Sequence, residues 1–223
     1  MRFVAISDTH GRQGQYLTVP DGDVFIHAGD FTRMGNEWEV QAFAYWLAQL
    51  PHRHKIVVAG NHDHAFDPAF TNLIGVREAE QRLADVGATY LHDSGVVLDG
   101  IPIWGSPYQP TYGRNWAFNR DIGPDLKIHW DLIPAGTQVL VTHGPPLGHG
   151  DFVPRGVHAG CPDLLAALSR VRPVYHVFGH VHEGHGATVE PQSGTHCLNV
   201  SMFSVSGGGP YNPCTVFDLP GGG

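Results

Sequence analysis

The sequence predicts an α/β fold built from layers of strands and helices. Short, mostly apolar runs recur along the 223-residue chain, and each is too short for a helix but suits a buried strand. Amphipathic segments lie between several of these runs and begin with helix-start signals. Strands that alternate with helices along a chain are typical of layered α/β proteins.

The predicted strands follow one another from the N-terminus. Two further segments, 88–92 and 95–106, resemble a hairpin in which Asp99 and Gly100 supply the turn signal. The buried runs that precede and follow this pair occupy residues 3–7, 24–28, 56–59, 139–142, 175–178 and 197–200.

The predicted helices lie between the strands. The first covers residues 37–50 and begins with a capping box, in which Glu39 stands three residues after Asn36. Amphipathic patterns predict two more helices, at 77–86 and 162–171. No linker, repeat or break in composition divides the chain, so we expect residues 1–223 to form a single domain.

Composition limits the partners that this chain could bind. It carries 13 basic and 21 acidic residues, with a formal net charge of -8, which argues against a protein that grips an extended nucleic acid. A small substrate fits this charge better. The 16 histidines outnumber lysine and arginine together and suit a metal site.

Cysteine usage and hydropathy indicate a compartment. Cys161, Cys197 and Cys214 are widely spaced and odd in number, which indicates neither a disulfide framework nor a zinc ribbon. The N-terminal apolar stretch is too short for a signal sequence, and no window has the roughly 20 apolar residues of a membrane span. We therefore expect a cytoplasmic protein without a membrane partner.

Polar residues follow almost every predicted strand. Ligands of α/β proteins bind at the carboxyl ends of strands, and these ends read "DTH", "GD", "GNHD", "THG", "GHVH" and "NVS". Seven donors are too many for one ion but fit two ions about 3.5 to 4 Å apart that share one carboxylate. Asp30 is the natural bridge. The candidate ligands are Asp8, His10, Asp30, Asn61, His143, His180 and His182.

The order of these motifs resembles the signature of the calcineurin-like metallophosphoesterases. Within that superfamily, "GIPIWGSPYQP", "NWAFN", "THGPPLGHGD" and "RPVYHVFGHVHEGHG" are similar to the metallophosphoesterase-domain branch and its bacterial cyclic-nucleotide phosphodiesterase relatives. The likeness covers roughly residues 3 to 205. It implies a four-layer α/β/β/α sandwich of two mixed sheets flanked by helices.

The resemblance also implies a role for each ligand. Asp8, His10 and His182 would hold one divalent ion, and Asn61, His143 and His180 would hold the second, with Asp30 between them. Mixed oxygen and imidazole ligands suit manganese or iron, with zinc as a further choice.

Two residues beside the ligands are catalytic candidates. In similar enzymes the histidine at the position of His62 protonates the leaving oxygen or stabilises charge on it, and general acid catalysis of this kind contributes about two to four orders of magnitude. Asp63 either fixes the tautomer of His62 or makes an ordinary loop hydrogen bond.

The expected function is hydrolysis of small or cyclic nucleotide phosphodiesters by a metal-bound hydroxide. Phosphomonoesterase, protein phosphatase, nuclease and a silent scaffold of the same fold are the alternatives. The second motif reads "GDFTRMG" where protein phosphatases continue "GDxVDRG", and no basic track supports a nuclease. A silent scaffold should show broken ligands, and this chain shows none.

Several residues are weaker candidates for contacts with the substrate. The segment 108–118 joins aromatics with Arg114 and Asn115, and it either stacks on a nucleobase or packs in the core. Asn199 follows a predicted strand at the same edge. His149 lies beside the proposed site in sequence and could reach a phosphate.

Overall fold

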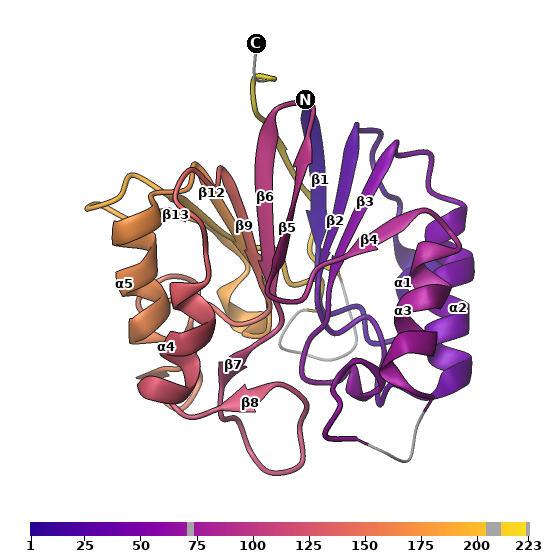
Figure 1. Ribbon diagram of the computed structural model, residues 1–223, viewed down its shortest axis with the longest axis horizontal. Helices are drawn as coiled ribbons and strands as arrows, with labels where there is room; N and C mark the ends of the chain where they lie inside the picture. Colours follow the sequence, from indigo (N-terminus) through magenta and orange to yellow (C-terminus); the bar gives the residue numbers. More distant parts are fainter. Residues whose placement is uncertain (71–73, 204–210, 222–223) are drawn as a thin grey trace.

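A computed structural model describes residues 1–70, 74–203 and 211–221. Its first sheet has the order β15-β1-β2-β3-β4 (Figure 1). The last four of these strands run parallel to one another, whereas the C-terminal strand pairs antiparallel with β1. The bounds are β1 (Arg2–Ile6), β2 (Val24–Ala28), β3 (His54–Val58), β4 (Ala88–Tyr90) and β15 (Thr215–Asp218).

The second sheet has the order β13-β14-β12-β9-β6-β5. Its four central strands are parallel, and the strand at each edge is antiparallel to its neighbour. The bounds are β5 (Ser94–Leu98), β6 (Ile101–Ser106), β9 (Val139–Thr142), β12 (Tyr175–Phe178), β13 (Gly186–Val189) and β14 (His196–Asn199).

Helices cover the outer face of each sheet (Figure 1). On the first sheet lie α1 (Gln13–Tyr16), α2 (Glu37–Ala48) and α3 (Val76–Ala84), and on the second lie α4 (Pro124–Asp131) and α5 (Pro162–Val171). The predicted four-layer α/β/β/α sandwich is therefore confirmed. Within the described ranges, no helix combines the length and apolar character that crossing a bilayer requires.

The core follows from the alternation of side chains along each strand. Phe3 and Ala5 of β1 pack in the layer between the sheets, together with Val139 and Val141 of β9. The intervening Val4 belongs to the layer beneath the helices. Successive side chains of a strand point to opposite faces, so both faces of the central strands are buried.

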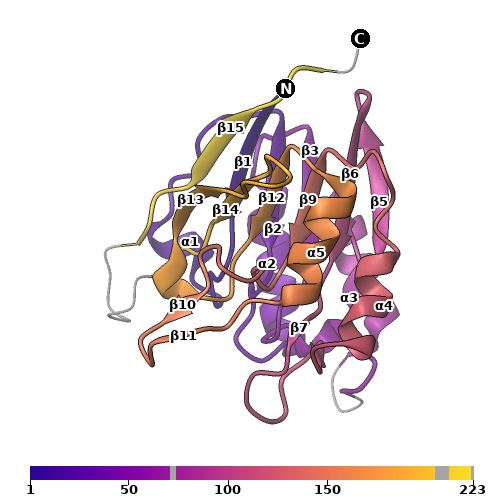
Figure 2. The same ribbon diagram turned by 90° about the vertical axis from the view of Figure 1, so that its left-hand side faces the viewer.

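Short elements connect the layers. Two small ribbons lie outside the main sheets, one at the bottom of the molecule in Figure 1 and the other at the lower left in Figure 2. Their strands are β7 (Gln109–Pro110), β8 (Asn119–Arg120), β10 (Phe152–Val153) and β11 (Val157–His158), and the 3₁₀ turns are η1 (His64–Phe66) and η2 (His182–Gly184).

The predicted hairpin is right at its turn and wrong in one of its strands. Asp99 and Gly100, with φ of 45° and 82°, join β5 to β6, as a two-residue turn with positive φ does in antiparallel ribbons. The segment 88–92 does not pair with this ribbon. Its residues 88–90 form β4 and run parallel to β3 in the first sheet, because α3 returns the chain to that edge.

Candidate metal centre

Five strand ends bring the seven predicted ligands to one edge of the sandwich. The loop after β1 carries Asp8 and His10, and the loops after β2, β3 and β9 carry Asp30, Asn61 and His143. The loop after β12 carries the remaining two. Parallel strands end at the same edge, which is why residues so distant in sequence meet there.

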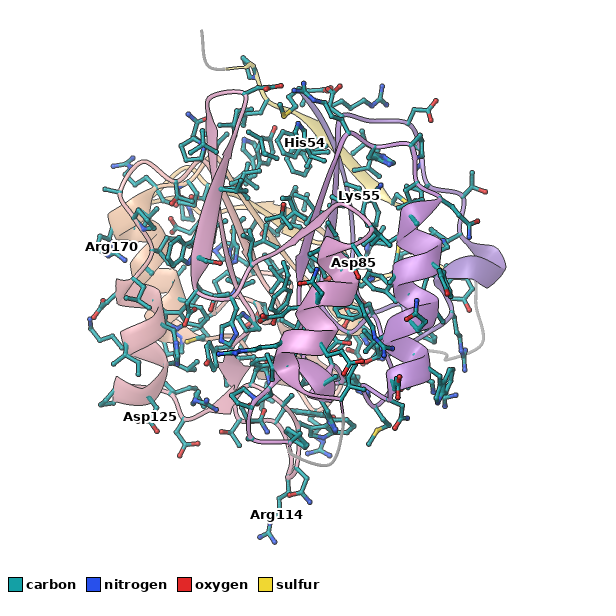
Figure 3. All side chains as sticks on the ribbon, turned by 45° about the vertical axis from the view of Figure 1, so that its right-hand side comes forward. His54, Lys55, Asp85, Arg114, Asp125 and Arg170 are labelled. Carbon is teal, nitrogen blue, oxygen red and sulfur yellow. The ribbon has the colours of Figure 1, made fainter. Side chains whose placement is uncertain are left out.

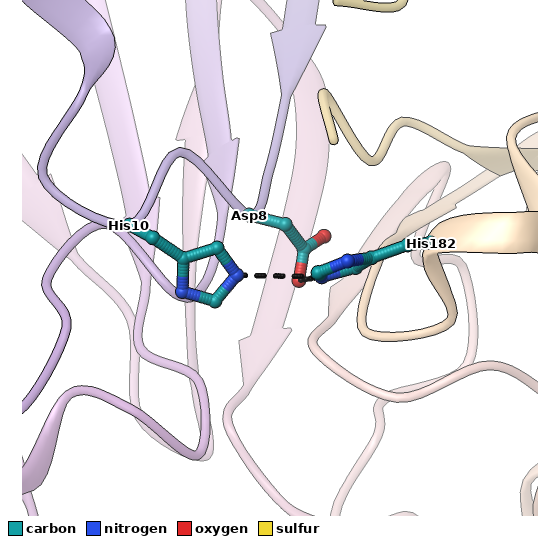
Figure 4. A group of neighbouring side chains, drawn as sticks. All are labelled: Asp8, His10 and His182. Atoms are coloured by element: carbon teal, nitrogen blue, oxygen red, sulfur yellow. Dashed lines mark hydrogen bonds and ion pairs between the residues drawn. The ribbon is translucent and has the colours of Figure 1, made fainter. Parts of the chain in front are cut away.

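Asp8, His10 and His182 form the first cluster (Figure 4). The Nε2 atoms of the two histidines are 3.3 Å apart, and His182 Nε2 lies 3.5 Å from a carboxylate oxygen of Asp8. Asp8 is fully buried, and it also accepts the backbone N–H of His180. Two imidazoles and a carboxylate that converge in this way match the ligands that divalent first-row metals prefer.

Asn61, His143 and His180 form the second cluster. His143 Nδ1 donates to the Ala28 carbonyl at 3.0 Å, and its Nε2 lies 2.9 Å from the Asn61 Oδ1 atom. His180 Nδ1 lies 2.8 Å from the same oxygen. Ring protons can satisfy these contacts in the metal-free protein, and a cation that replaced those protons would find one amide oxygen and two imidazole nitrogens as donors.

Asp30 stands between the two clusters, with one oxygen toward each. Its Oδ2 atom lies 4.0 Å from His10 Nε2, and its Oδ1 atom lies 3.4 Å from His143 Nε2. The carboxylate is almost completely buried. A carboxylate with this placement can bridge two ions, as the sequence predicts.

The backbone around the ligands is held in an uncommon conformation. Asp8, His10, Asp30 and His180 all have positive φ, between 46° and 67°. Residues other than glycine rarely adopt such values, and strained residues of this kind concentrate at functional sites. The sequence carries no signal of this feature.

Two glycines let the backbone approach the clusters closely. Gly29 has φ of +100°, and a side chain there would collide with the ring of His143. At Gly60 a side chain would collide with Asp30 and with the same ring. Because a methyl group fits at neither position, both glycines are needed to bring the ligands within range.

Burial and mutual charge set the protonation of the cluster. Burial lowers the pKa of His10 to about 4 and the pKa of His180 to about 3, so both are neutral at pH 7 and able to ligate. Burial opposes the charged form of His143 as well, but the adjacent Asp30 carboxylate raises the pKa of that histidine to about 9. A proton at this nitrogen occupies the place that a cation would take.

His62 points its Nε2 atom at the same centre. Its Nδ1 atom donates to the backbone carbonyl of Arg33 at 2.7 Å, and its Nε2 lies 4.0 Å from Asp30 Oδ2. The imidazole edge contacts the ring of His10, with centroids 4.5 Å apart. The free nitrogen therefore faces the position that a phosphoryl oxygen would occupy.

Asp63 does not orient His62, which corrects the first of its two expected roles. The buried Asp63 carboxylate accepts the backbone N–H groups of Asp30, Thr32 and Gly60, together with the Thr32 hydroxyl. Burial, and then the charge of Asp30, raise the pKa of Asp63 to about 7. Asp63 joins the loops after β2 and β3. The Arg33 carbonyl, and not Asp63, orients the His62 ring.

Asn199 is also a structural residue instead of a substrate contact. Its buried amide donates to the carbonyls of Gly150 and Val181, and its oxygen accepts the Ser201 N–H. Both amide hydrogens are used within the protein, and Asn199 does not line the groove over the clusters. His149, the other candidate from this region, bonds the Thr188 hydroxyl and does not line the groove over the clusters.

The aromatic segment 108–118 divides between the core and the site. Arg114 extends away from the body of the protein (Figure 3), and both it and Asn115 are exposed, so neither expected contact is made. Two aromatics of the same segment reach the centre instead. The Tyr112 ring meets His180 edge-on at 5.5 Å, and Trp116 packs on His62 at 4.3 Å.

A groove of about 500 Å³ lies over the clusters. Asp30, Asn61, His62, His180 and His182 line its base. Much of its wall was not predicted from the sequence, because it comes from the β10–β11 hairpin and consists of Val153, Pro154, Arg155, Val157 and Ala159. Two-residue strands leave no periodic pattern, so no sequence signal marked this hairpin.

The layered fold and the paired donor clusters define a protein of the metallophosphoesterase class. A sequence profile of the calcineurin-like phosphoesterase family matches residues 1–184. The chain belongs to this family. It is 42% identical, in an alignment of 236 positions, to metallophosphoesterase domain-containing protein 1 of Homo sapiens, and the alignment covers 98% of this chain and 71% of the human protein.

Other similar proteins agree with this assignment. UPF0046 protein C25E10.12 of Caenorhabditis elegans is 40% identical, over 99% of this chain and 81% of its own length. Among solved structures, TT1561 of Thermus thermophilus superposes with a TM-score of 0.56 at 14% identity and covers 89% of this chain and 88% of its own. The likeness to that structure concerns the fold alone.

Proposed function

We propose that this chain hydrolyses small phosphodiesters, with cyclic nucleotides as the preferred class, at a centre that holds two divalent ions. The observation that carries the proposal is the placement of Asp30, whose two oxygens face separate donor clusters. Membership of the family supports metal-dependent hydrolysis of phosphoesters. When bound, two such ions activate water and neutralise the charge on a phosphoryl group.

The chain divides its ligands between the two positions. Asp8, His10 and His182 would hold one ion, and Asn61, His143 and His180 the other. This mixture of oxygen and imidazole donors suits manganese or iron, and zinc is also compatible with it. Three cysteines without disulfides suit a reducing, cytoplasmic setting.

His62 would act on the oxygen that leaves. Its Nδ1–H is fixed by the Arg33 carbonyl, so a proton carried on Nε2 points into the groove. Trp116 packs on the imidazole and limits the directions in which it can turn. A ring held by one hydrogen bond and one aromatic contact is preorganised for proton transfer.

Charge at the base of the groove favours diesters over monoesters. A monoester carries nearly two negative charges and a diester only one, so a monoesterase must supply additional cationic contacts. The lining of the groove includes the carboxylates of Asp30 and Glu183 against one arginine, Arg155 of the β10–β11 hairpin, which is less cationic charge than a monoester requires. The Tyr112 ring, which lines the same groove, would contact the base of a nucleotide.

The test compares matched substrates on the metal-loaded protein. We expect a higher kcat/KM for bis-p-nitrophenyl phosphate than for p-nitrophenyl phosphate, and turnover of 2′,3′- or 3′,5′-cyclic AMP. A preference for the monoester would contradict the diesterase proposal. Failure on the cyclic nucleotides alone would remove only that substrate class. Complete inactivity with manganese, iron and zinc would favour a silent scaffold.

A further inference from the structure

We propose that the β10–β11 hairpin selects the substrate, and that Arg155 at its tip binds a second anionic group of a nucleotide ester. This inference rests on the proposed function, because it concerns the same groove. Among nucleotide phosphodiesters, it favours those that carry an additional phosphate beyond the one that is hydrolysed.

Hydrogen bonds hold the base of the hairpin together. Its base is fixed by the buried Asp151, whose carboxylate accepts the N–H groups of Gly148 and Gly160 and the Nδ1–H of His158. The Ala159 N–H returns to the Asp151 carbonyl at 2.9 Å. A carboxylate with three such partners holds the two arms together, so the wall exists before any ligand binds.

The same hairpin is tied to the metal centre. Asn199 donates one amide hydrogen to the Gly150 carbonyl, beside the hairpin, and another to the Val181 carbonyl, between the ligands His180 and His182. Gly150 fits against Asn199 and against the Gly184 carbonyl, and a side chain there would be crowded. The wall is therefore held at a fixed position relative to the ligands.

The face that the hairpin turns to the groove is mostly apolar. Val153, Pro154 and Val157 line it, and Val157 is 53% exposed. Tyr112 lines the same groove from the β7–β8 loop and is 60% exposed. Exposed apolar and aromatic side chains around a polar base are typical of a site for a ring-bearing ligand.

Arg155 is the cation of this wall. Within residues 1–70, 74–203 and 211–221 its guanidinium has no ion pair and no hydrogen bond, although the chain carries an excess of acidic residues. Arg53 and Arg82 pair with carboxylates, whereas Arg33, Arg77 and Arg114 also have no ion pair among the described residues. Arg155 differs from these in that it lines the groove. An unpaired guanidinium beside a site for phosphoesters is suited to bidentate contact with a phosphate.

Arg155 and the metal ligands come from different segments that line the same groove. The metal ligands lie at the base of the groove, whereas Arg155 lies in the turn between β10 and β11, beyond the anchored arms of the hairpin. A phosphate at the clusters would leave this guanidinium free for another group. A nucleoside diester with a second phosphate on its sugar supplies that group.

The first test uses two substrates that differ by one phosphate. These are thymidine 5′-(p-nitrophenyl phosphate) and its 3′-phosphorylated form. We expect the parent protein to prefer the 3′-phosphorylated ester, and Arg155→Gln to lower that preference about tenfold, the loss typical of one charge-assisted contact. Arg155→Lys should retain part of it. Bis-p-nitrophenyl phosphate, which lacks the extra group, should show a smaller difference among the three proteins than the 3′-phosphorylated ester does.

Arg114→Gln is the matched control, because Arg114 is equally exposed but extends away from the protein (Figure 3). A second measurement is independent of turnover. Calorimetric titration should show that Arg155→Gln weakens binding of thymidine 3′,5′-bisphosphate and leaves binding of thymidine 5′-monophosphate unchanged. If Arg155→Gln keeps the parent's preference in both measurements, or if Arg114→Gln loses it equally, the inference is wrong.

The two proposals fail in different ways. A parent protein that hydrolyses bis-p-nitrophenyl phosphate but does not distinguish the thymidine esters contradicts only the role of Arg155. A parent protein that hydrolyses no ester contradicts the proposed function. In that case the titration with the two thymidine phosphates still decides whether Arg155 binds the second phosphate.

Discussion

Single side chains at this centre act through partners that lie far away in the sequence. His62 owes its orientation to a backbone carbonyl 29 positions earlier, and the Asp8 carboxylate accepts a backbone N–H 172 positions later. Each contact is made between two strand-end loops. The chemistry of the site therefore depends on how accurately the two sheets place those loops.

Replacing Asp30 tests whether one carboxylate serves both positions. We expect Asp30→Asn to lower the affinity for both ions, each by about tenfold or more. Loss of even a residue that hydrogen-bonds to a metal ligand has an effect of that size. Elemental analysis after dialysis at limiting metal gives the stoichiometry. Asp125→Asn, an exposed change on α4, is the control (Figure 3). One ion kept at full affinity would contradict a shared bridge.

Replacing His62 separates catalysis from metal binding. We expect His62→Ala to retain both ions and to slow hydrolysis by about 10² to 10⁴-fold for esters with basic leaving groups. Esters of acidic phenols should be affected much less, because their oxygen departs without a proton. A series of aryl phosphodiesters of graded leaving-group pKa measures this dependence. Loss of metal, or an equal loss across the series, would argue against proton donation by His62.

The candidate metal ligands could be predicted from the sequence, whereas the residues that hydrogen-bond to the ligand-bearing loops could not. Asp8, His10, Asn61 and the others stand directly after apolar runs, so the position of a strand end is visible in the sequence. For Asp63 the sequence leaves two roles open, orientation of His62 or an ordinary loop hydrogen bond. Its carboxylate satisfies three backbone N–H groups from two loops, and such partners can be known only once the loops are placed.

At the level of elements, the start of α2 does more than cap a helix. Glu39 completes the predicted capping box with Asn36, and its buried carboxylate also accepts the N–H groups of Arg33 and Met34. The Arg33 carbonyl is the acceptor for His62. The first turn of α2 therefore holds the loop that orients the histidine.

Replacing Glu39 tests this connection. We expect Glu39→Ala to lower the free energy of unfolding by about 1 to 2 kcal/mol, as loss of a cap does, and to slow hydrolysis of esters with basic leaving groups selectively. Glu39→Gln keeps an acceptor and should recover most of both properties. Urea unfolding and the same aryl ester series measure them. If only stability falls, Glu39 acts as a cap and does not position His62.

Helices and strands with a clear hydrophobic pattern were predicted, and short elements were not. The helix at 162–171 was predicted at the bounds of α5, and the strand at 24–28 at those of β2. The eight-residue helix α4 was missed, because only Leu126 and Trp130 of its residues are buried. Two apolar positions four residues apart are too few to establish a helical period.

At the level of the whole molecule, the layers followed from the family resemblance and not from periodicity. Apolar runs cannot show which sheet a strand joins, so residues 88–90 were paired with the wrong neighbours. The C-terminal strand β15 pairs with β1 across nearly the whole chain, a contact that no local pattern indicates. The prediction that residues 1–223 form a single domain stays a prediction.

Acid sensitivity of the whole fold can be traced to buried histidines such as His176. His176 is fully buried on β12, and its Nε2 donates to the Thr142 hydroxyl at 2.8 Å, while that hydroxyl donates to the Gly144 carbonyl. Burial, and to a lesser degree the charge of His149, lower the pKa of His176 to about 3. In the unfolded chain the same group titrates near pH 6.5.

The sign of the effect follows from proton uptake. Above pH 6.5 His176 is neutral in both states and contributes nothing, and below pH 3 it is protonated in both. Between these limits the unfolded chain binds a proton that the folded chain does not, so the free energy of unfolding falls as the pH falls, by about 1.4 kcal/mol per pH unit.

We therefore expect His176→Gln to make the pH dependence of stability shallower between pH 6.5 and pH 4, because glutamine can donate to Thr142 but cannot titrate. Urea unfolding of the metal-free protein at several pH values measures the slope. Metal is removed because metal binding itself depends on pH and would change the free energy of unfolding with metal concentration. Val177→Ala, the next residue on β12, lowers stability without removing a titratable group and should displace the curve in parallel. Equal slopes for the parent and His176→Gln would mean that the buried ring gains its proton before the fold is lost.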